Sequence, residues 1–270
     1  MKRVSLVVSL VLVGFVVVLA VVGLFWTPFD PTLVSRDRLL PPGVPHLLGT
    51  DGLGMDIFSR IMVGAKMCLL IGISGVAIAA GIGVPIGIAA GMTRRFWVQE
   101  IVLRVNDVLY AFPALLLAIL LAAAIGGSTW TAVIAIGVSS VPAFVRIARA
   151  GTLQVVSLDY VPAARVSGTP RRTIAVRHVL PNIAPLVGVQ ASVSFGIAIL
   201  AEAGLSYLGL GSPATTPTWG RMLRDAQNLL FRDPLQAVWP GLAIAFAVLG
   251  FNLLGDALRD HLDPRLREVS

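Results

Sequence analysis

Apolar residues gather in six long stretches, and polar residues, glycines and prolines are concentrated between them. A helix that crosses a membrane needs about 20 consecutive, mostly apolar residues. None of the six stretches contains a lysine, arginine, aspartate, glutamate or histidine, so the insertion of each into lipid is favourable. The pattern predicts six transmembrane helices, at approximately residues 4–26, 67–92, 108–124, 130–145, 183–201 and 237–254.

The segments between the predicted helices differ in length and character. On the side opposite the N-terminus, the outer loops 27–66 and 202–236 are long and contain several prolines. On the side of the N-terminus, the inner loop 146–182 is the longest segment and contains no long apolar run. Segments of this length inside a compact protein are usually functional. We interpret residues 1–270 as one transmembrane domain with a functional inner loop.

The composition agrees with a protein whose main solvent is lipid. Hydrophobic residues make up 56% of the chain and charged residues 13%, whereas a soluble domain is roughly 45–50% apolar and about 25% charged. This balance excludes an intrinsically disordered chain, and the single cysteine, Cys68, excludes a disulfide scaffold. The predicted fold class is therefore all-α, a polytopic membrane protein.

The net charge of +7 lies entirely on one side of the predicted topology. If the N-terminus is inside, the inner segments hold 14 basic and 7 acidic residues, and the outer segments hold 7 of each. Because basic residues accumulate in cytoplasmic loops, we expect both termini inside. The positive net charge of the chain therefore indicates its orientation in the membrane, and we expect no nucleic-acid partner.

The inner loop carries signals for two short helices around a glycine. Asp159 precedes the first helix, which has Pro162 in its first turn, and Gly168 is expected to end it. Thr169 is expected to cap the second helix, with Pro170 at its first position. The sequence therefore predicts a compact, basic knob on the inner side of the membrane.

The surface of this knob admits two interpretations on physical grounds alone. Ala163 and Ala164 are small, so the backbone of another protein would be able to approach them closely. The arginines of the same loop would equally well hold the loop against lipid headgroups. The residue types therefore leave docking of a protein and binding to the bilayer surface open.

Several segments, in the right order along the chain, resemble the permease subunits of ABC importers. The segment beginning at Asp159 resembles the EAA loop of that family, and the others resemble its segments after the first helix and around the fifth. The segments are 46–60, 159–168, 177–182, 201–211 and 218–220. The resemblance is greatest to the second permease subunit of dipeptide, oligopeptide and nickel systems and covers nearly the whole chain. The chain departs from the family at Pro162, where the loop usually has glutamate.

The resemblance implies a fold, a function and a set of partners. It implies the type I ABC importer permease fold, in which this chain forms half of a pore with a second homologous permease chain. It also implies a location in the plasma membrane, the inner membrane of a bacterium. Cytoplasmic ABC ATPase domains, on one or two chains, would hydrolyse ATP, and an extracytoplasmic substrate-binding protein would deliver a peptide. The coupling residues that it implies in the loop 159–182 are Asp159, Ala163, Ala164, Arg165, Gly168, Arg171, Arg172, His178 and Pro181.

The resemblance also implies that the chain is a transport subunit and not an enzyme. No GxxxxGK[ST] phosphate-binding loop occurs in the chain, so we expect ATP and Mg to bind to the partner subunits and no cofactor to bind here. The three histidines lie in different loops on opposite sides of the membrane, so we expect no metal site. We also expect no catalytic residue.

Two further groups of residues are candidates for a role in transport. Polar residues interrupt the fifth helix or follow it, and they either line the pore or make hydrogen bonds and salt bridges within the protein; they are Gln190, Ser192, Ser194 and Glu202. A stripe of small residues at four-residue intervals in the second helix allows close packing, within the chain or against a second chain. The stripe consists of Gly75, Ala79, Gly83, Gly87 and Gly91.

Two alternatives to a peptide importer remain at this stage. Nickel or another small solute is an alternative cargo, because similar permeases serve both. A secondary carrier that works without ATP is an alternative of a different class. Such a carrier would normally keep ionisable residues at membrane depth, and the six predicted helices contain none.

Overall fold

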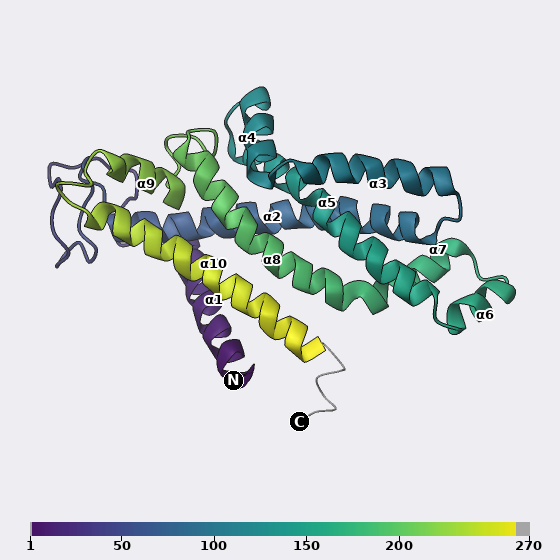
Figure 1. Cartoon of the computed structure of the whole chain (residues 1–270). Helices are drawn as coiled ribbons and strands as arrows, with labels where there is room; N and C mark the ends of the chain where they lie inside the picture. The colour runs from purple at the N-terminus through teal and green to yellow at the C-terminus, as the bar shows by residue number, and fades with distance from the viewer. Residues whose placement is uncertain (1, 263–270) are drawn as a thin grey trace.

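The computed structural model describes residues 2–262, with side chains described for residues 5–260. All regular elements in this range are helical, which confirms the predicted all-α class. Three long helices lie side by side and form the centre of the molecule (Figure 1): α2 (Ile57–Met92), α5 (Thr129–Val156) and α8 (Leu180–Tyr207). Residue 1 and residues 263–270 of the predicted domain 1–270 lie outside the described residues. The prediction that both termini lie inside therefore concerns residues that the structure does not describe.

The remaining helices surround this centre. Helix α1 (Lys2–Phe25) and α10 (Leu235–Leu262) pack against each other. Helix α1 also packs against α2, and α10 packs mainly against α8. The other helices in the described range are α3 (Phe96–Ala111), α4 (Ala114–Ile125), α6 (Tyr160–Val166), α7 (Arg171–Ile174), the π-helix η1 (Ala175–Val179) and α9 (Trp219–Gln227). In Figure 1, α9 lies at one end of the molecule, and α6 and α7 lie at the other.

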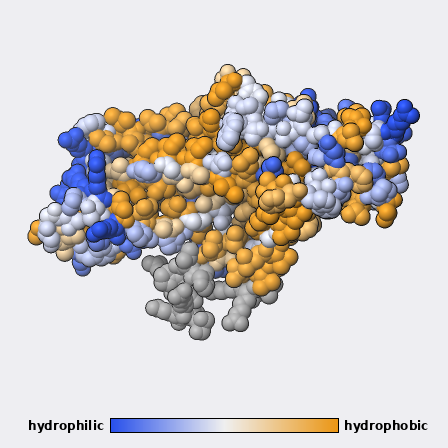
Figure 2. Space-filling model, turned by 180° about the vertical axis from the view of Figure 1, so that it is seen from behind, coloured by the Kyte–Doolittle hydropathy of each residue, from blue (hydrophilic) through white to orange (hydrophobic). Residues whose placement is uncertain are grey.

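The distribution of apolar side chains identifies the membrane-embedded part. Five helices within the described range are long and apolar enough to span a membrane, and the bent pair α3 and α4 would be a sixth span. Figure 2 shows an apolar belt between two ends at which hydrophilic residues gather. The chain is therefore a multi-pass membrane protein.

The long helices extend beyond the boundaries that hydropathy predicts. Helix α2 begins at Ile57 rather than residue 67, so ten residues of the expected outer loop 27–66 are helical. Helix α5 continues to Val156 rather than 145, and much of the expected inner loop 146–182 is therefore helical. For α2 the reason is local: Asp56 caps the helix by accepting a hydrogen bond from the Ser59 backbone N–H at 2.7 Å. Hydropathy detects the part of a helix in lipid and not its capped, polar end.

The prediction of one continuous transmembrane helix at residues 108–124 is wrong. The structure has two helices there, α3 and α4, whose axes differ by 88° across Phe112 and Pro113. Phe112 is extended, with φ −79° and ψ 129°, because the ring of a following proline disfavours the helical conformation. The chain therefore turns sharply where a continuous helix was expected.

The connection between α5 and α8 contains the two predicted short helices, and one predicted cap is wrong. Gly168 has φ +77°, a left-handed conformation that favours glycine, and it ends α6 as expected. The Gly168 N–H donates to the Arg165 carbonyl, and the Thr169 N–H donates to the Ala164 carbonyl. This is the Schellman arrangement. Thr169 therefore closes α6, and Pro170, not Thr169, precedes the first residue of α7.

Helix α5 of the same chain packs directly against the stripe of small residues on α2. A Cβ atom at Gly83 would lie 2.6 Å from the Phe144 Cβ, and one at Gly87 would lie 2.6 Å from the Val145 carbonyl oxygen. Gly75 and Gly91 face α5 in the same way, and Ala79 between them is fully buried. The two backbones are thus in direct contact along the stripe, which leaves no room there for a helix of a second chain.

Candidate functional site

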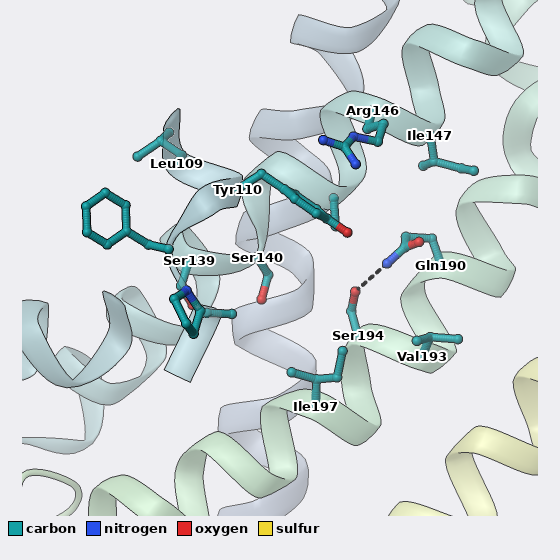
Figure 3. A pocket seen from close by; sticks show the side chains of 14 residues that line it. Leu109, Tyr110, Ser139, Ser140, Arg146, Ile147, Gln190, Val193, Ser194 and Ile197 are labelled. Carbon is teal, nitrogen blue, oxygen red and sulfur yellow. Dashed lines mark hydrogen bonds between the residues drawn. The ribbon is translucent and has the colours of Figure 1, made fainter. Parts of the chain in front are cut away.

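A cavity of about 440 Å³ opens between three parts of the chain, beside the sharp turn that separates α3 from α4. Its walls are formed by residues 109–114 around that turn, residues 139–147 of α5 and residues 190–197 of α8 (Figure 3). All three parts belong to helices that are candidate spans. The cavity is therefore positioned within the membrane-embedded part, and the sharp turn at Pro113 helps to create it.

Two of the four predicted pore-lining residues line this cavity. Gln190 and Ser194 lie one helical turn apart on α8, and the Gln190 Nε2 donates a hydrogen bond to the Ser194 Oγ at 3.0 Å (Figure 3). Ser192 does not line the cavity: its Cβ lies 3.0 Å from the position that a Cβ at Gly255 would occupy, so it faces α10. Helix α8 thus contributes a hydrogen-bonded pair of polar side chains, Gln190 and Ser194, to the wall of the cavity.

Glu202, the fourth predicted pore-lining residue, is not among the residues that line the cavity. Glu202 lies inside α8, is only 2% exposed, and accepts a hydrogen bond from the Ser206 Oγ at 2.7 Å. Within residues 5–260 it forms no ion pair, so the alternative of a structural salt bridge is not realised there. Glu202 is a buried hydrogen-bonding residue in this structure.

A basic and aromatic pair at the cavity was not predicted from the sequence. The Arg146 guanidinium carbon lies 3.9 Å from the centre of the Tyr110 ring, an attractive cation–π geometry. The Arg146 Nη2 also donates to the Asp107 Oδ1 at 3.5 Å. Both partners belong to α3, and Arg146 belongs to α5, so these contacts join the two helices at the cavity wall. The only sequence signal was an arginine immediately after the apolar stretch 130–145.

The predicted coupling residues lie together at one end of the molecule, in the segment 157–182, which comprises the connection between α5 and α8 and the first residues of α8 (Figure 1). Ala163 and Gly168 are exposed, and no atom lies within 4 Å of a Cβ built on Gly168. Ala164 is half-buried. The small residues therefore form an open surface. The remaining predicted coupling residues are partly or fully exposed: Asp159, Arg165, Arg171, Arg172, His178 and Pro181.

This segment is held against the long helices by apolar and polar contacts. Val161, Ile174 and Val179 are fully buried and belong to one core cluster with residues of α2 and α5. The Asn182 Nδ2 donates to the His178 carbonyl at 2.6 Å and to the Tyr160 hydroxyl at 3.2 Å. The segment is thus anchored on one face and open on the other, as a docking surface requires. The described residues contain no cluster of three or more histidine, cysteine or acidic side chains that would hold a metal ion.

Comparison with known proteins covers both of these sites. Residues 83–268 match the family described as binding-protein-dependent transport system inner membrane component. The chain is 41% identical over 260 residues to the glutathione transport system permease protein GsiD of Pectobacterium atrosepticum, covering 94% of this chain and 86% of that protein. It is 38% identical over 268 residues to the dipeptide transport system permease protein DppC of Alkalihalophilus pseudofirmus, covering 96% and 87%. The family match includes every residue that lines the cavity.

Proposed function

We propose that this chain, which belongs to the family of binding-protein-dependent transport system inner membrane components, is a permease subunit of an ATP-driven importer of short peptides. The observation that carries the proposal is the similarity to the two transport permeases, which extends over at least 94% of the chain. The substrates named for those relatives, glutathione and a dipeptide, are both short peptides. A short peptide is therefore the cargo that best fits this chain.

The cavity beside α5 and α8 forms this chain's share of the translocation pathway. It opens at the surface rather than being enclosed, so a second homologous permease chain is required to complete a pore around it. Its wall combines an apolar surface with Gln190, Ser194 and the two serines Ser139 and Ser140. Such a wall offers a passing peptide hydrogen-bonding groups at few positions and holds it weakly, which transport requires.

The segment 157–182 faces the cytoplasm in this proposal and contacts an ABC ATPase domain through Ala163, Ala164 and Gly168. The excess of basic residues on this side supports the orientation. ATP and Mg bind to the ATPase partners, and closure of two such domains pushes the segment. Because it joins α5 to α8, the push tilts both helices that line the cavity and biases a two-state change of access. A substrate-binding protein delivers the peptide at the opposite end of the molecule.

Purification of the tagged chain from gently solubilised membranes tests this proposal. We expect an ATPase and a second permease chain to be recovered with it, and the eluate to hydrolyse ATP. Peptides extracted from the accompanying binding protein would identify the cargo. Recovery of the intact, folded chain alone, together with transport by that chain in liposomes without ATP, would contradict the importer and favour a secondary carrier.

Replacement of Gln190 tests the role of the cavity. A Gln190→Leu variant loses a polar group from the wall, and one lost hydrogen bond to the passing peptide lowers transport about fivefold. Peptide uptake is measured in cells and divided by the amount of permease in the membrane. Ser192→Ala serves as the matched control, since Ser192 lies on the same helix outside the cavity. Unchanged uptake by Gln190→Leu would show that this wall does not contact the cargo.

A further inference from the structure

Three arginines from different elements converge on one hollow of about 320 Å³. Arg94 comes from the turn after α2, Arg165 from α6 and Arg171 from the start of α7. The part of the chain that the structure describes forms no ion pair with any of them. Three like charges around one space repel each other unless an anion lies between them. Guanidinium groups bind phosphate with paired hydrogen bonds, so this basic hollow is suited to a phosphate group.

An apolar groove of about 400 Å³ adjoins the basic hollow. Its wall on α2 includes Val84, Ile88 and Ala89, and its other wall includes Val176 and Leu180. Met92 and Arg171 line both the groove and the hollow, so the two spaces meet. Ala89, Val176 and Leu180 are exposed, so the groove is open at the surface of the protein.

The groove lies at the end of a membrane span, which places the hollow next to lipid headgroups. Helix α2 is a candidate span that ends at Met92, and Arg94 follows two residues later. The groove thus runs along the part of α2 that lies at acyl-chain depth, and the arginines lie where that helix leaves the membrane. A ligand that fills both spaces has an anionic group at one end and a hydrocarbon chain at the other.

We propose that the basic hollow and the apolar groove form a binding site for an anionic phospholipid. The phosphate lies among Arg94, Arg165 and Arg171, and one acyl chain lies along α2 in the groove. A free phosphate ion would fill the hollow and leave the groove empty, and an acidic segment of a protein partner would do the same. The continuity of the two spaces is what selects a lipid.

The bound lipid connects the segment 157–182 to the bilayer. Arg165 and Arg171 belong to that segment, whereas Arg94 belongs to the turn after α2. A phosphate shared by the three therefore holds the segment against the end of a membrane span. The exposed residues Ala163 and Gly168 do not line the hollow, so they remain open to a docked protein while the lipid is bound. Arg165 and Arg171, which the family resemblance assigned to coupling, hold the lipid in this proposal.

Titration of the purified full-length chain with defined lipids tests the site. The delipidated chain in detergent is titrated with phosphatidylglycerol, with phosphatidylcholine of the same acyl composition, and with inorganic phosphate, and bound molecules are counted by native mass spectrometry. We expect one phosphatidylglycerol to bind with the highest affinity and phosphatidylcholine to bind at least about fivefold more weakly. Inorganic phosphate at millimolar concentration should not displace the tightly bound lipid.

Matched variants locate the bound lipid. Arg94→Gln and Arg171→Gln are each expected to weaken phosphatidylglycerol binding about fivefold, whereas Arg177→Gln, an exposed arginine outside both spaces, leaves it unchanged. Ala89→Phe fills the groove and should weaken binding to a similar extent. Ala77→Phe is its control, because Ala77 is exposed on the same helix outside the groove. Thermal unfolding of each variant verifies that it is folded.

Two results would overturn the proposal. Loss of anion binding in the arginine variants with no effect of Ala89→Phe would show a site for a free phosphate and not for a lipid. Unchanged phosphatidylglycerol binding in the arginine variants, together with loss of ATPase recovery in the purification described above, would show that the arginines bind a protein partner. Neither result bears on whether the chain belongs to a peptide importer.

Discussion

A Gly87→Leu variant is expected to lose about 3 kcal/mol of unfolding free energy, and most of the chain should fail to accumulate in the membrane. A Cβ at Gly87 would already lie 2.6 Å from the Val145 carbonyl oxygen and 2.7 Å from the Ala148 Cβ. The nearest of these atoms belongs to the backbone, which cannot rotate away as a side chain does. Helices α2 and α5 would have to separate, and contacts along their whole shared stripe would be lost.

A second glycine of α2 provides the control for this prediction. No atom lies within 4 Å of a Cβ built on Gly81, and Gly81 is exposed. Gly81→Leu should therefore leave the membrane level and the thermal unfolding temperature in detergent nearly unchanged. If both leucine variants accumulated and unfolded alike, close contact of α2 with α5 would not be what stabilises the chain.

A Gly168→Trp variant is expected to lose both peptide uptake and the ATPase activity that accompanies it, while the chain remains folded. The space around Gly168 is open, so an indole ring fits in the isolated chain. The ring would, however, occupy the surface that we propose for the ATPase domain. Both peptide uptake and transport-stimulated ATPase activity should fall by at least about tenfold, which corresponds to a loss of about 1.4 kcal/mol in docking.

The backbone conformation of Gly168 requires a control that separates bulk from strain. With φ +77°, any larger residue is strained there by about 1–2 kcal/mol, and asparagine tolerates this conformation best among the larger residues. Gly168→Asn should therefore retain most transport and ATPase coupling. Full coupled activity in Gly168→Trp, at a normal membrane level, would exclude this surface as the docking site.

The apolar parts of the long helices are predictable from sequence because lipid leaves few alternatives. A backbone in hydrocarbon must satisfy its own hydrogen bonds, so a long apolar stretch there becomes a helix. The first stretch, predicted at 4–26, corresponds closely to α1 (Lys2–Phe25). Hydropathy does not detect the polar extensions of α2 and α5: α2 begins where Asp56 caps it, ten residues before its apolar stretch, and α5 continues to Val156 beyond the end of its apolar stretch. Helix α9 was missed for the same reason: it is short and begins at a Thr218 cap.

The sharp turn between α3 and α4 shows why proline alone does not predict a break. Pro113 accompanies the 88° bend, yet Pro85, Pro142, Pro185 and Pro240 lie inside continuous helices. In membrane helices, neighbouring helices and local adjustments accommodate the backbone groups that a proline leaves unpaired. Whether a proline bends or breaks a helix therefore depends on packing that the sequence does not display.

Only those features of the candidate site that depend on the periodicity of a single helix were predictable from the sequence. Gln190 and Ser194 are four residues apart, so they share a face of α8. By the same periodicity Ser192, two residues from each, lies on another face, and grouping the three together was wrong. The contact of Arg146 with Tyr110 joins residues 36 positions apart on different helices. No single-helix pattern carries such a contact, because it depends on how α3 folds back after α2.

The length of α2 makes it a lever between the two faces of the membrane. Its 36 residues extend over about 54 Å at a rise of about 1.5 Å per residue, well beyond a hydrocarbon core of about 30 Å. One end of the helix lies near α9, and the other end lies beside α7. A tilt of about 10° around the midpoint would displace each end by about 5 Å in opposite directions. In the importer that we propose, this single helix links the arrival of cargo on one face to movement of the ATPase-docking surface on the other.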